Sequence, residues 1–200
     1  EGQWIWRPLT RLGYPSLSRY DLRGIRGFGL LQRDRDWANY RDDEAKYDRR
    51  PSVWIEPRDG WGRGRIELLE LPAPHEGIDN IAAWWTPAEA VTPGKPLDLN
   101  YSVSFMSDEP KEHHLGRAIA TRVDRRDGRP VRVEVNFTGE SRNGVSGNSV
   151  EPKVLCQRGE VSNVRVEPES EGSCRLCFDV RPNGAEPLEM SAVLQRGQEA

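Results

Sequence analysis

The sequence predicts a mainly β protein. Apolar and polar residues alternate over residues 97–105 and 131–137, and such alternation is typical of strands with one buried face. The other apolar runs are short and end at glycine, proline or aspartate, which also favours strands joined by turns. Helical spacing occurs in one stretch, residues 37–47. We therefore expect strands along most of the chain and one helical insertion.

Five short apolar or aromatic runs in the first half predict strands. They cover residues 4–9, 27–32, 52–56, 65–71 and 80–85. Between the second and the third run, Trp37, Tyr40, Glu44 and Tyr47 follow at spacings of three, four and three. This spacing places three aromatic rings on one face of a helix of about three turns. Pro51 ends the predicted helix, because proline disfavours helical geometry in the residue before it.

Residues 91–96 mark the predicted domain boundary, because two prolines and a glycine interrupt any helix or ladder there. Seven predicted strands follow this stretch. They cover residues 97–105, 118–123, 131–137, 152–156, 161–166, 174–180 and 189–194. Short strands separated by turns predict an immunoglobulin-like sandwich over this half. The Cys…Trp…Cys pattern of antibody domains is absent, so the prediction concerns architecture alone.

Charge and hydropathy exclude two classes of partner. The chain has 29 basic and 32 acidic side chains and a net charge of −3, without the basic block of nucleic-acid-binding proteins. No apolar run approaches the roughly 18 residues of a membrane-spanning helix. We therefore expect no nucleic-acid partner and no membrane span. All seven tryptophans lie before residue 86, so aromatic side chains concentrate in the first half.

The three cysteines leave several interpretations open. Cys174 and Cys177 have the spacing of a metal-binding or redox pair, but a strand pattern points them to opposite faces. The alternatives are metal or redox chemistry, a disulfide from Cys156 to one of the pair, and ordinary core cysteines. The strand pattern favours the last alternative.

No other motif predicts a metal or a cofactor. His75, and the adjacent His113 and His114 in a loop rich in Glu and Lys, are typical of solvated turn residues rather than of ligands. A Gly-rich phosphate loop, a Gly-x-Ser-x-Gly elbow and a His-Glu-x-x-His helix are absent from the sequence. We therefore expect no metal site and no cofactor.

Aromatic residues beside arginine and aspartate suggest a carbohydrate site. Sugars present flat faces of C–H bonds that pack on Trp and Tyr, and hydroxyls that bond to Arg and to carboxylates. In the strand predicted for residues 4–9, Trp4 and Trp6 share one face and Arg7 lies on the other. The Arg-Asp-Arg-Asp run of residues 33–36 follows an apolar strand. It is either a ladder of surface ion pairs, each contributing about 0–1 kcal/mol, or part of a cleft at the strand end.

Five motifs carry a resemblance to a known family. They lie at residues 4–9 (Trp-Ile-Trp-Arg-Pro-Leu), 27–36, 50–57, 61–64 (Trp-Gly-Arg-Gly) and 79–81 (Asp-Asn-Ile). In this order they resemble the periplasmic glucan biosynthesis protein G and D family, which makes or trims osmoregulated periplasmic glucans. Family members are longer, and the chain begins at Glu1 without Met or a signal sequence. We therefore expect it to correspond to the C-terminal portion of a longer protein.

The resemblance implies a fold, a location and a partner. Residues 1–92 are expected to be the C-terminal part of a large, galactose-mutarotase-like β-sandwich that binds glucan, and residues 97–200 the immunoglobulin-like domain. The resemblance also implies a periplasmic protein with a long cleft for a β-1,2-linked glucan backbone. The sequence does not determine the oligomeric state, and a homodimer is one candidate.

The resemblance leaves two functions open. Some relatives are β-1,2-glucanases that act with inversion, in which a carboxylic acid protonates the departing oxygen and a relayed water attacks. In that family the acid Asp belongs to a segment upstream of the Trp-Ile-Trp-Arg motif, so no catalytic residue is assigned in this chain. One hypothesis is a protein that binds the glucan and remodels or cleaves it, as a glycoside hydrolase or transglycosylase does. The alternative is a non-catalytic glucan-binding scaffold that assists backbone synthesis or export.

Residues in the matching motifs are the predicted glucan contacts. They are Trp4, Trp6, Arg7, Arg33, Asp34, Arg35, Asp36, Tyr40 and Tyr47. The two tyrosines belong to a segment that can lie over the cleft in the family, which would make them lid contacts. The alternative for that segment is a helix that packs its aromatic rings into the core.

Overall fold

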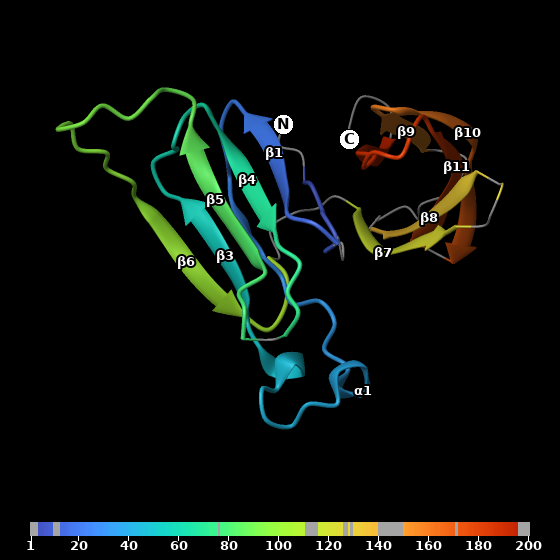
Figure 1. The fold of residues 1–200 in the computed structure, drawn as a ribbon, viewed down its shortest axis with the longest axis horizontal. Coiled ribbons are helices and arrows are strands. Elements are labelled where there is room, and N and C mark those ends of the chain that lie inside the picture. Colours follow the sequence, from blue (N-terminus) through green and yellow to red (C-terminus); the bar gives the residue numbers. More distant parts are fainter. Residues whose placement is uncertain are drawn as a thin grey trace. The chain divides into compact units, whose positions relative to one another are not determined.

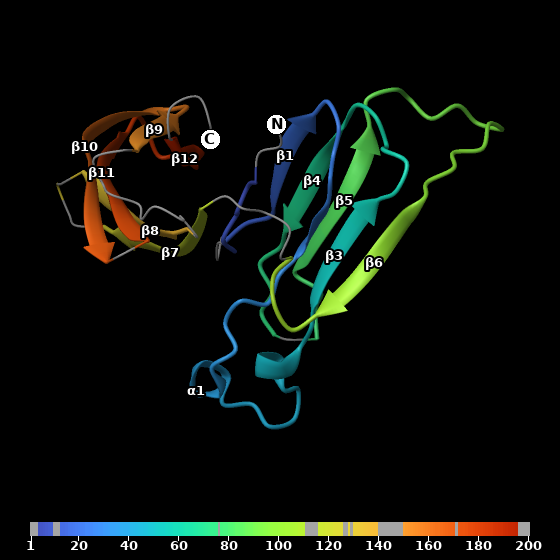
Figure 2. The ribbon, with the colours of Figure 1, turned by 180° about the vertical axis from the view of Figure 1, so that it is seen from behind.

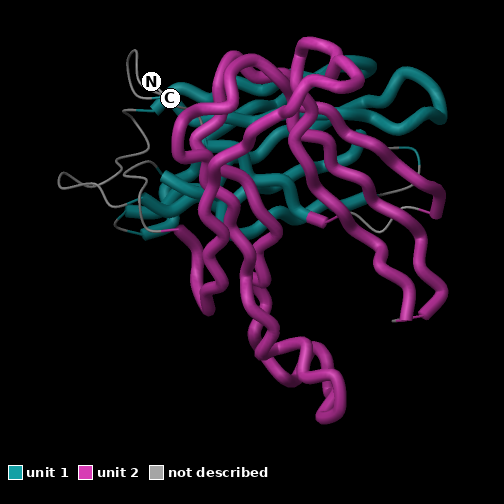
Figure 3. Tube along the Cα trace, turned by 90° about the vertical axis from the view of Figure 1, so that its left-hand side faces the viewer, with its two compact units in different colours: residues 1–8, 112–200 teal, residues 9–111 magenta. Residues whose placement is uncertain are grey.

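The computed structural model describes residues 4–9, 13–75, 77–110, 116–125, 128, 130–139, 150–170 and 172–195. Over these residues the backbone forms strands β1 to β12, one α-helix and one 3₁₀-helix. The prediction of a mainly β protein is therefore confirmed. The chain divides into two compact units, which Figure 3 draws in different colours: unit 1 comprises residues 1–8 and 112–200, and unit 2 comprises residues 9–111.

Unit 2 contains two antiparallel sheets of three strands each (Figure 1). One sheet has the order β1-β4-β5 and consists of β1 (Ser16–Leu22), β4 (Gly64–Glu70) and β5 (Ile81–Pro87). The other has the order β2-β3-β6 and consists of β2 (Phe28–Leu30), β3 (Ser52–Pro57) and β6 (Tyr101–Met106). The chain therefore passes repeatedly from one sheet to the other.

Strand β4 shows how side-chain alternation gives the first sheet two different faces. Ile66 and Leu68 lie on one face, opposite Trp85 and Ala83 of β5, and Leu68 is buried. Glu67 lies on the other face, because successive side chains of a strand point to opposite sides. The Ile66 face is therefore apolar and aromatic near Trp85 and also carries the buried Glu70, whereas the opposite face carries Glu67.

The strands predicted for residues 27–32, 52–56, 65–71 and 80–85 are confirmed as β2 to β5. The strand predicted for residues 4–9 is wrong, since these residues have no regular secondary structure. Strand β1 is an addition that the polarity pattern does not indicate. It buries Ser18 and leaves Leu17 exposed. The apolar residues of β1 therefore do not indicate which face of the strand is buried.

The single predicted helix is much shorter than expected. Helix α1 covers only Trp37–Tyr40, and the 3₁₀-helix η1 covers Tyr47–Arg49. Arg41 ends α1 in a left-handed conformation with a φ of 51°. The Asp42 carboxylate then accepts hydrogen bonds from the backbone amides two and three residues further on, a local arrangement that competes with helix. The segment extends beyond the ends of the strands, as Figures 1 and 2 both show.

The strand that follows the proline-rich stretch belongs to unit 2. Strand β6 pairs with β3 in antiparallel register, so strands from both sides of residues 91–96 share one sheet. Residues 91–96 themselves are an exposed connection between β5 and β6. The division between the compact units falls after residue 111.

Unit 1 contains a four-stranded and a two-stranded antiparallel sheet. The larger has the order β10-β11-β8-β7 and consists of β7 (Arg117–Asp124), β8 (Val131–Thr138), β10 (Gly159–Ser170) and β11 (Ser173–Pro182). The smaller pairs β9 (Glu151–Cys156) with β12 (Met190–Gln195). The six strands predicted beyond residue 110 are confirmed as β7 to β12.

The core of unit 1 lies on one face of the larger sheet. Its buried members alternate along β8 and β11: Val133, Val135, Leu176, Phe178 and Val180. Side chains of the smaller sheet, including those of Val154 on β9 and Leu194 on β12, pack against this cluster. The apolar residues that made these strands recognisable are therefore the residues that hold the two sheets together.

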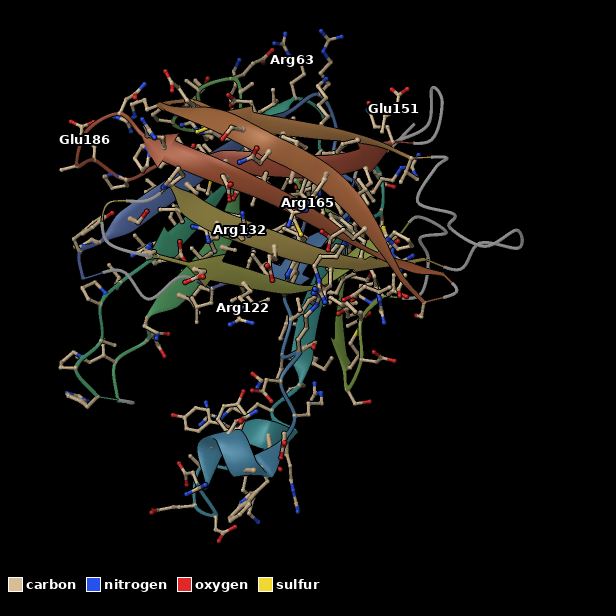
Figure 4. All side chains as sticks on the ribbon, turned by 90° about the vertical axis from the view of Figure 1, so that its right-hand side faces the viewer. Arg63, Arg122, Arg132, Glu151, Arg165 and Glu186 are labelled. Carbon is tan, nitrogen blue, oxygen red and sulfur yellow. The ribbon has the colours of Figure 1, made fainter. Side chains whose placement is uncertain are left out.

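The opposite face of the larger sheet is polar and charged. Figure 4 labels three arginines on it: Arg122 from β7, Arg132 from β8 and Arg165 from β10. The Arg132 guanidinium donates to both carboxylate oxygens of Asp179, at 2.9 and 3.2 Å, and the Asn163 amide donates to the same carboxylate at 2.7 Å. These donors hold the pKa of Asp179 below its ordinary value, with the Arg132 bonds the largest cause.

The bonds to Asp179 predict a pH-dependent contribution to stability. We expect Asp179→Asn to lower the free energy of unfolding at neutral pH by about 1 kcal/mol, because Arg132 is partly exposed and solvent screens its charge. A depressed native pKa stabilises the fold above the ordinary Asp pKa of about 4, and this contribution is lost as the pH falls through the native pKa. Urea denaturation at a series of pH values should therefore show a shallower acid loss for the variant. Identical acid dependence in the wild type and the variant would contradict the prediction, and Glu151→Gln, at an exposed carboxylate of β9, serves as the control.

The three cysteines are free thiols in the structure. Cys174 and Cys177 are buried on β11, and they lie on opposite faces of the strand as the sequence predicts. Burial raises the pKa of both thiols, and no disulfide links either to Cys156. The geometry matches the interpretation of Cys174 and Cys177 as core residues.

The histidines and the other possible metal ligands form no metal site in the described residues. His75 is exposed and its Nδ1 accepts a hydrogen bond from the Gly77 amide at 3.2 Å, so its prediction as a turn residue is confirmed. His113 and His114 lie outside the described residues. In the described ranges, no three His, Cys, Asp or Glu side chains gather closely enough to share a metal ion. No described helix is long and apolar enough to cross a membrane.

Candidate functional site

Four aromatic side chains of unit 2 contact one another around Trp61, and we call them the aromatic cluster. They are Phe28, Trp61, Trp85 and Tyr101. The ring centroid of Trp61 lies 5.3 Å from that of Trp85 and 5.6 Å from that of Tyr101. Phe28 meets Trp61 edge-on at 6.3 Å. These separations lie within the 4.5–7 Å range of favourable aromatic pairs.

Trp61 reaches the cluster because of the turn that carries it. Gly60 and Gly62 flank it with φ angles of 69° and 74°, a left-handed conformation that only glycine adopts without strain. The Trp61 indole N–H donates to the backbone carbonyl of Asn100 at 3.3 Å. The Asn100 side chain in turn donates to Asp59 at 2.8 Å. The β3–β4 turn is thus tied to the start of β6, and Trp61 lies between the two sheets.

The other partners come from strands of both sheets. Phe28 lies on β2, Trp85 on β5 and Tyr101 on β6. On the opposite face of β2, the glycines at 27 and 29 leave room for Trp54 of β3. A Cβ at Gly27 would lie 2.5 Å from the Trp54 ring, and one at Gly29 would lie 2.0 Å from a backbone oxygen of β3. The glycines of this motif therefore serve close strand packing.

A hollow of about 190 Å³ opens beside the aromatic cluster. It is lined by Phe28, Ile55, Trp61, Ala83, Trp84, Trp85, Leu99 and Tyr101. Tyr101 is 49% exposed, so aromatic surface faces solvent at the hollow. Its volume is below the roughly 300–1,000 Å³ of a pocket that encloses a small ligand. The shape suits an extended ligand that lays part of its length against the aromatic rings.

The charged run of residues 33–36 does not form a ladder of mutual ion pairs. Arg33 pairs with Glu109, and Arg35 donates to the backbone carbonyls of Asp48 and Arg50 at 3.3 and 2.9 Å. These bonds hold the two ends of the extended segment together. The run therefore builds the segment that contains α1.

The two aspartates of the run organise the backbone around α1. Asp36 accepts from the Ala38 amide at 2.9 Å and is the N-cap of the helix. Asp34 accepts from the Asn39 side chain at 2.9 and 3.1 Å, and also from the Asp36 amide at 3.1 Å. Both aspartates are exposed, so their remaining acceptor capacity faces solvent.

Tyr40 and Tyr47 stack on each other with ring centroids 6.1 Å apart. The Tyr40 hydroxyl accepts from Gln32 at 2.7 Å and donates to the Asp34 carbonyl at 3.1 Å, and the Arg50 guanidinium lies over the Tyr47 ring at 4.2 Å. Trp37 is 47% exposed and its indole donates to Asp43. The prediction of three aromatic rings on one helix face is therefore wrong, because the chain turns back after α1 and brings only the tyrosines together.

The position of Arg33 predicts that it contributes to stability. Its side chain is 19% exposed and that of Glu109 is 12% exposed, so alanine at this position would leave a largely buried carboxylate without this partner. We expect Arg33→Ala to lower the free energy of unfolding by about 1–3 kcal/mol. Thermal melting of Arg33→Ala beside Arg26→Ala, an exposed arginine of the same unit, measures the difference. Equal melting temperatures for the two variants would show that Arg33 is not needed for the fold.

Trp4, Trp6 and Arg7 fall in unit 1, whereas the other predicted contacts fall in unit 2. Trp4 and Trp6 are partly buried, and Arg7 donates to the Pro8 carbonyl at 2.6 Å. Within unit 2 the structure brings together residues 33–36 with both tyrosines. The nine predicted contacts are thus divided between the two compact units.

Sequence reasoning missed the aromatic cluster as a candidate site. Trp61, Trp84, Trp85 and Tyr101 were not among the predicted contacts, although the hollow is lined by all four. The signal available was local: a tryptophan between two glycines and an adjacent tryptophan pair at a strand end. Which aromatic rings meet depends on the pairing of β6 with β3, which brings Tyr101 beside Trp61.

The fold and the hollow define a class of protein: a mainly β chain with an aromatic surface hollow. The family model described as periplasmic glucan biosynthesis protein, MdoG, matches residues 1–200, and the chain belongs to this family. It is 40% identical to glucans biosynthesis protein D 1 of Ralstonia nicotianae, over 98% of this chain and 38% of that protein. It is 39% identical to glucans biosynthesis protein G of Pectobacterium atrosepticum, over 98% of this chain and 41% of that protein. The resemblance seen in the motifs is thereby confirmed, and the chain spans about two-fifths of the length of the curated relatives it matches.

Proposed function

We propose that the chain is a glucan-binding part of a periplasmic protein of osmoregulated periplasmic glucan biosynthesis, and that its ligand is a β-1,2-linked glucan backbone. Family membership and the names of the relatives support a role in glucan biosynthesis in the periplasm. The single observation that supports binding is the hollow lined by Trp61, Trp84, Trp85 and Tyr101. Flat C–H faces of glucose rings pack on such aromatic surfaces.

The proposal includes the domain roles that the resemblance implies. In it, residues 1–92 form the C-terminal part of a galactose-mutarotase-like glucan-binding sandwich, and residues 97–200 contain an immunoglobulin-like sandwich. Trp4, Trp6 and Arg7 are proposed as further glucan contacts, and the segment with Tyr40 and Tyr47 as a lid. Its exposed aspartates and its extension beyond the strands are compatible with that role. A homodimer stays a proposal.

The chemistry of the hollow favours binding over catalysis at this place. Glycoside hydrolases use a pair of carboxylic acids at the scissile bond, and no Asp or Glu lines the hollow. Cleavage or remodelling of the glucan therefore requires a carboxylic acid outside the hollow. The family resemblance implies such an acid in the relatives that act as glucanases. A non-catalytic scaffold that assists synthesis or export of the backbone requires only the binding surface.

One experiment tests the ligand and separates the two functions. The complete gene product is titrated with linear β-1,2-glucan in a calorimeter, and the mixture is then analysed for shorter oligosaccharides by chromatography. Binding with product release supports remodelling or cleavage, and binding without products supports the scaffold. Absence of heat together with absence of products would overturn the proposal. Linear β-1,4-glucan is the control for the linkage.

A further inference from the structure

A buried carboxylate lies on the face of the β1-β4-β5 sheet opposite to Trp85. The Glu67 side chain is only 9% exposed, and a buried charge is costly unless donors compensate it. It accepts hydrogen bonds from the Thr86 hydroxyl at 2.6 Å, the Arg19 Nε at 3.0 Å and the Trp84 indole N–H at 3.0 Å. Arg65 Nε lies 3.5 Å away. The bond from Thr86, with those from Arg19 and Trp84, holds the pKa of Glu67 below its ordinary value.

The sheet register produces this arrangement. Arg19 on β1, Glu67 on β4 and Trp84 on β5 are directly paired positions of three adjacent strands, which lie side by side in Figure 1. Directly paired side chains share a face and lie close enough to interact. The carboxylate therefore links the two outer strands of the sheet through the side chains of Arg19 and Trp84.

The consequence for Trp84 is a fixed indole with accessible carbon surface. Glu67 binds the only polar atom of the Trp84 ring system, yet the residue is 37% exposed. The surface that Trp84 offers to solvent is therefore mainly the apolar carbon of the ring. The side chains of Arg19 and Arg65 are 55% and 43% exposed beside it, which leaves N–H donors next to the apolar surface.

We propose that Trp84 is a stacking position for one pyranose ring of the glucan and that Glu67 is a positioning residue that holds the indole in place. Arg19 and Arg65 donate to hydroxyls at the edge of the stacked ring. Trp84 also lines the hollow, so the stacking position continues the aromatic surface around the edge strand β5. The inference rests on the proposed glucan binding and adds to it a specific ring contact and the residue that orients it.

The charges at this position favour an uncharged ligand. Arg19 and Arg65 face Glu67, and Asp21 lies opposite Arg65 on the same face. Two positive and two negative side chains leave no net charge to attract an anion. Apolar ring carbon flanked by hydrogen-bond donors matches a neutral sugar, whose ring face is apolar and whose edge carries hydroxyls.

The test follows Trp84 directly in the complete protein. The protein is labelled with 5-fluorotryptophan, and the fluorine resonance that is missing in Trp84→Phe is assigned to Trp84. Addition of linear β-1,2-glucan is expected to shift this resonance in the wild type. If calorimetry shows glucan binding but the Trp84 resonance does not shift, the inference is overturned and the proposed function is retained. A glucan that does not bind at all overturns both.

Variants separate stacking from positioning. We expect Trp84→Ala to weaken glucan binding about tenfold and Trp84→Phe to retain most of the affinity, because phenylalanine keeps an aromatic face. Glu67→Gln should weaken binding severalfold and broaden the Trp84 resonance, because the amide loses the charge that holds Arg19 and the indole. Tyr14→Ala, an exposed aromatic of the same unit, is the control. Equal affinity in the wild type and in folded Trp84→Ala would overturn the inference.

Discussion

Replacement of Leu176 by alanine is expected to lower the free energy of unfolding by about 2–5 kcal/mol. Leu176 is 0% exposed and belongs to the core cluster of unit 1 with Phe178. Its truncation removes apolar contacts and leaves a cavity between the larger and the smaller sheet. Urea denaturation of the complete protein measures the total loss, and hydrogen exchange of the β8 and β11 amides shows whether it is local to unit 1.

The matched control is Leu155→Ala on β9. Leu155 is 58% exposed, so the same chemical change removes little buried area and should cost less than about 0.5 kcal/mol. Similar losses for the two leucines would mean that the core does not lie between these sheets. A large loss for Leu176→Ala alone supports a core that lies between these sheets.

Replacement of Trp61 by alanine is expected to weaken binding of linear β-1,2-glucan about 30-fold, the effect of an aromatic hot spot worth about 2 kcal/mol. Trp61 contacts Phe28, Trp85 and Tyr101 and lines the hollow. Its loss removes one aromatic surface and frees the neighbouring rings to move. Titration calorimetry on protein whose folding is verified by circular dichroism gives the affinity.

Two further variants interpret the result for Trp61. Trp61→Phe keeps an aromatic ring in the β3–β4 turn and should recover most of the affinity, although it loses the bond to the Asn100 carbonyl. Tyr14→Ala should bind glucan like the wild type. Unchanged affinity in folded Trp61→Ala would place the glucan elsewhere, and residues 33–36 with Tyr40 and Tyr47 would then be the next surface to test.

Strands β8 and β11 could be predicted because their apolar residues alternate and their apolar face is buried. The same reasoning fails for β1, where Ser18 is buried and Leu17 is exposed. It also fails for the segment around α1, because aromatic spacing carries no information about the left-handed Arg41 or the turn made by Asp42. Local backbone hydrogen bonds decide that segment.

The candidate site shows the same limit. The Arg-Asp-Arg-Asp run could be located by its composition, but the roles of its members come from distant partners such as Glu109. The aromatic cluster could not be predicted from the sequence for a similar reason. Trp61, Trp85 and Tyr101 are far apart along the chain, and their rings meet only because β6 pairs with β3 and the β3–β4 turn is tied to Asn100.

By itself the sequence determined the mainly β class, most of the strands and the family, because alternation and motif order are properties of neighbouring residues. Only the tertiary structure decided which residues share a surface. Sheet pairing joins strands that are distant in sequence, and it places Glu67 between Arg19 and Trp84 and groups the aromatic rings around Trp61. Such contacts depend on strand register and sheet packing, which alternation along a single strand does not specify.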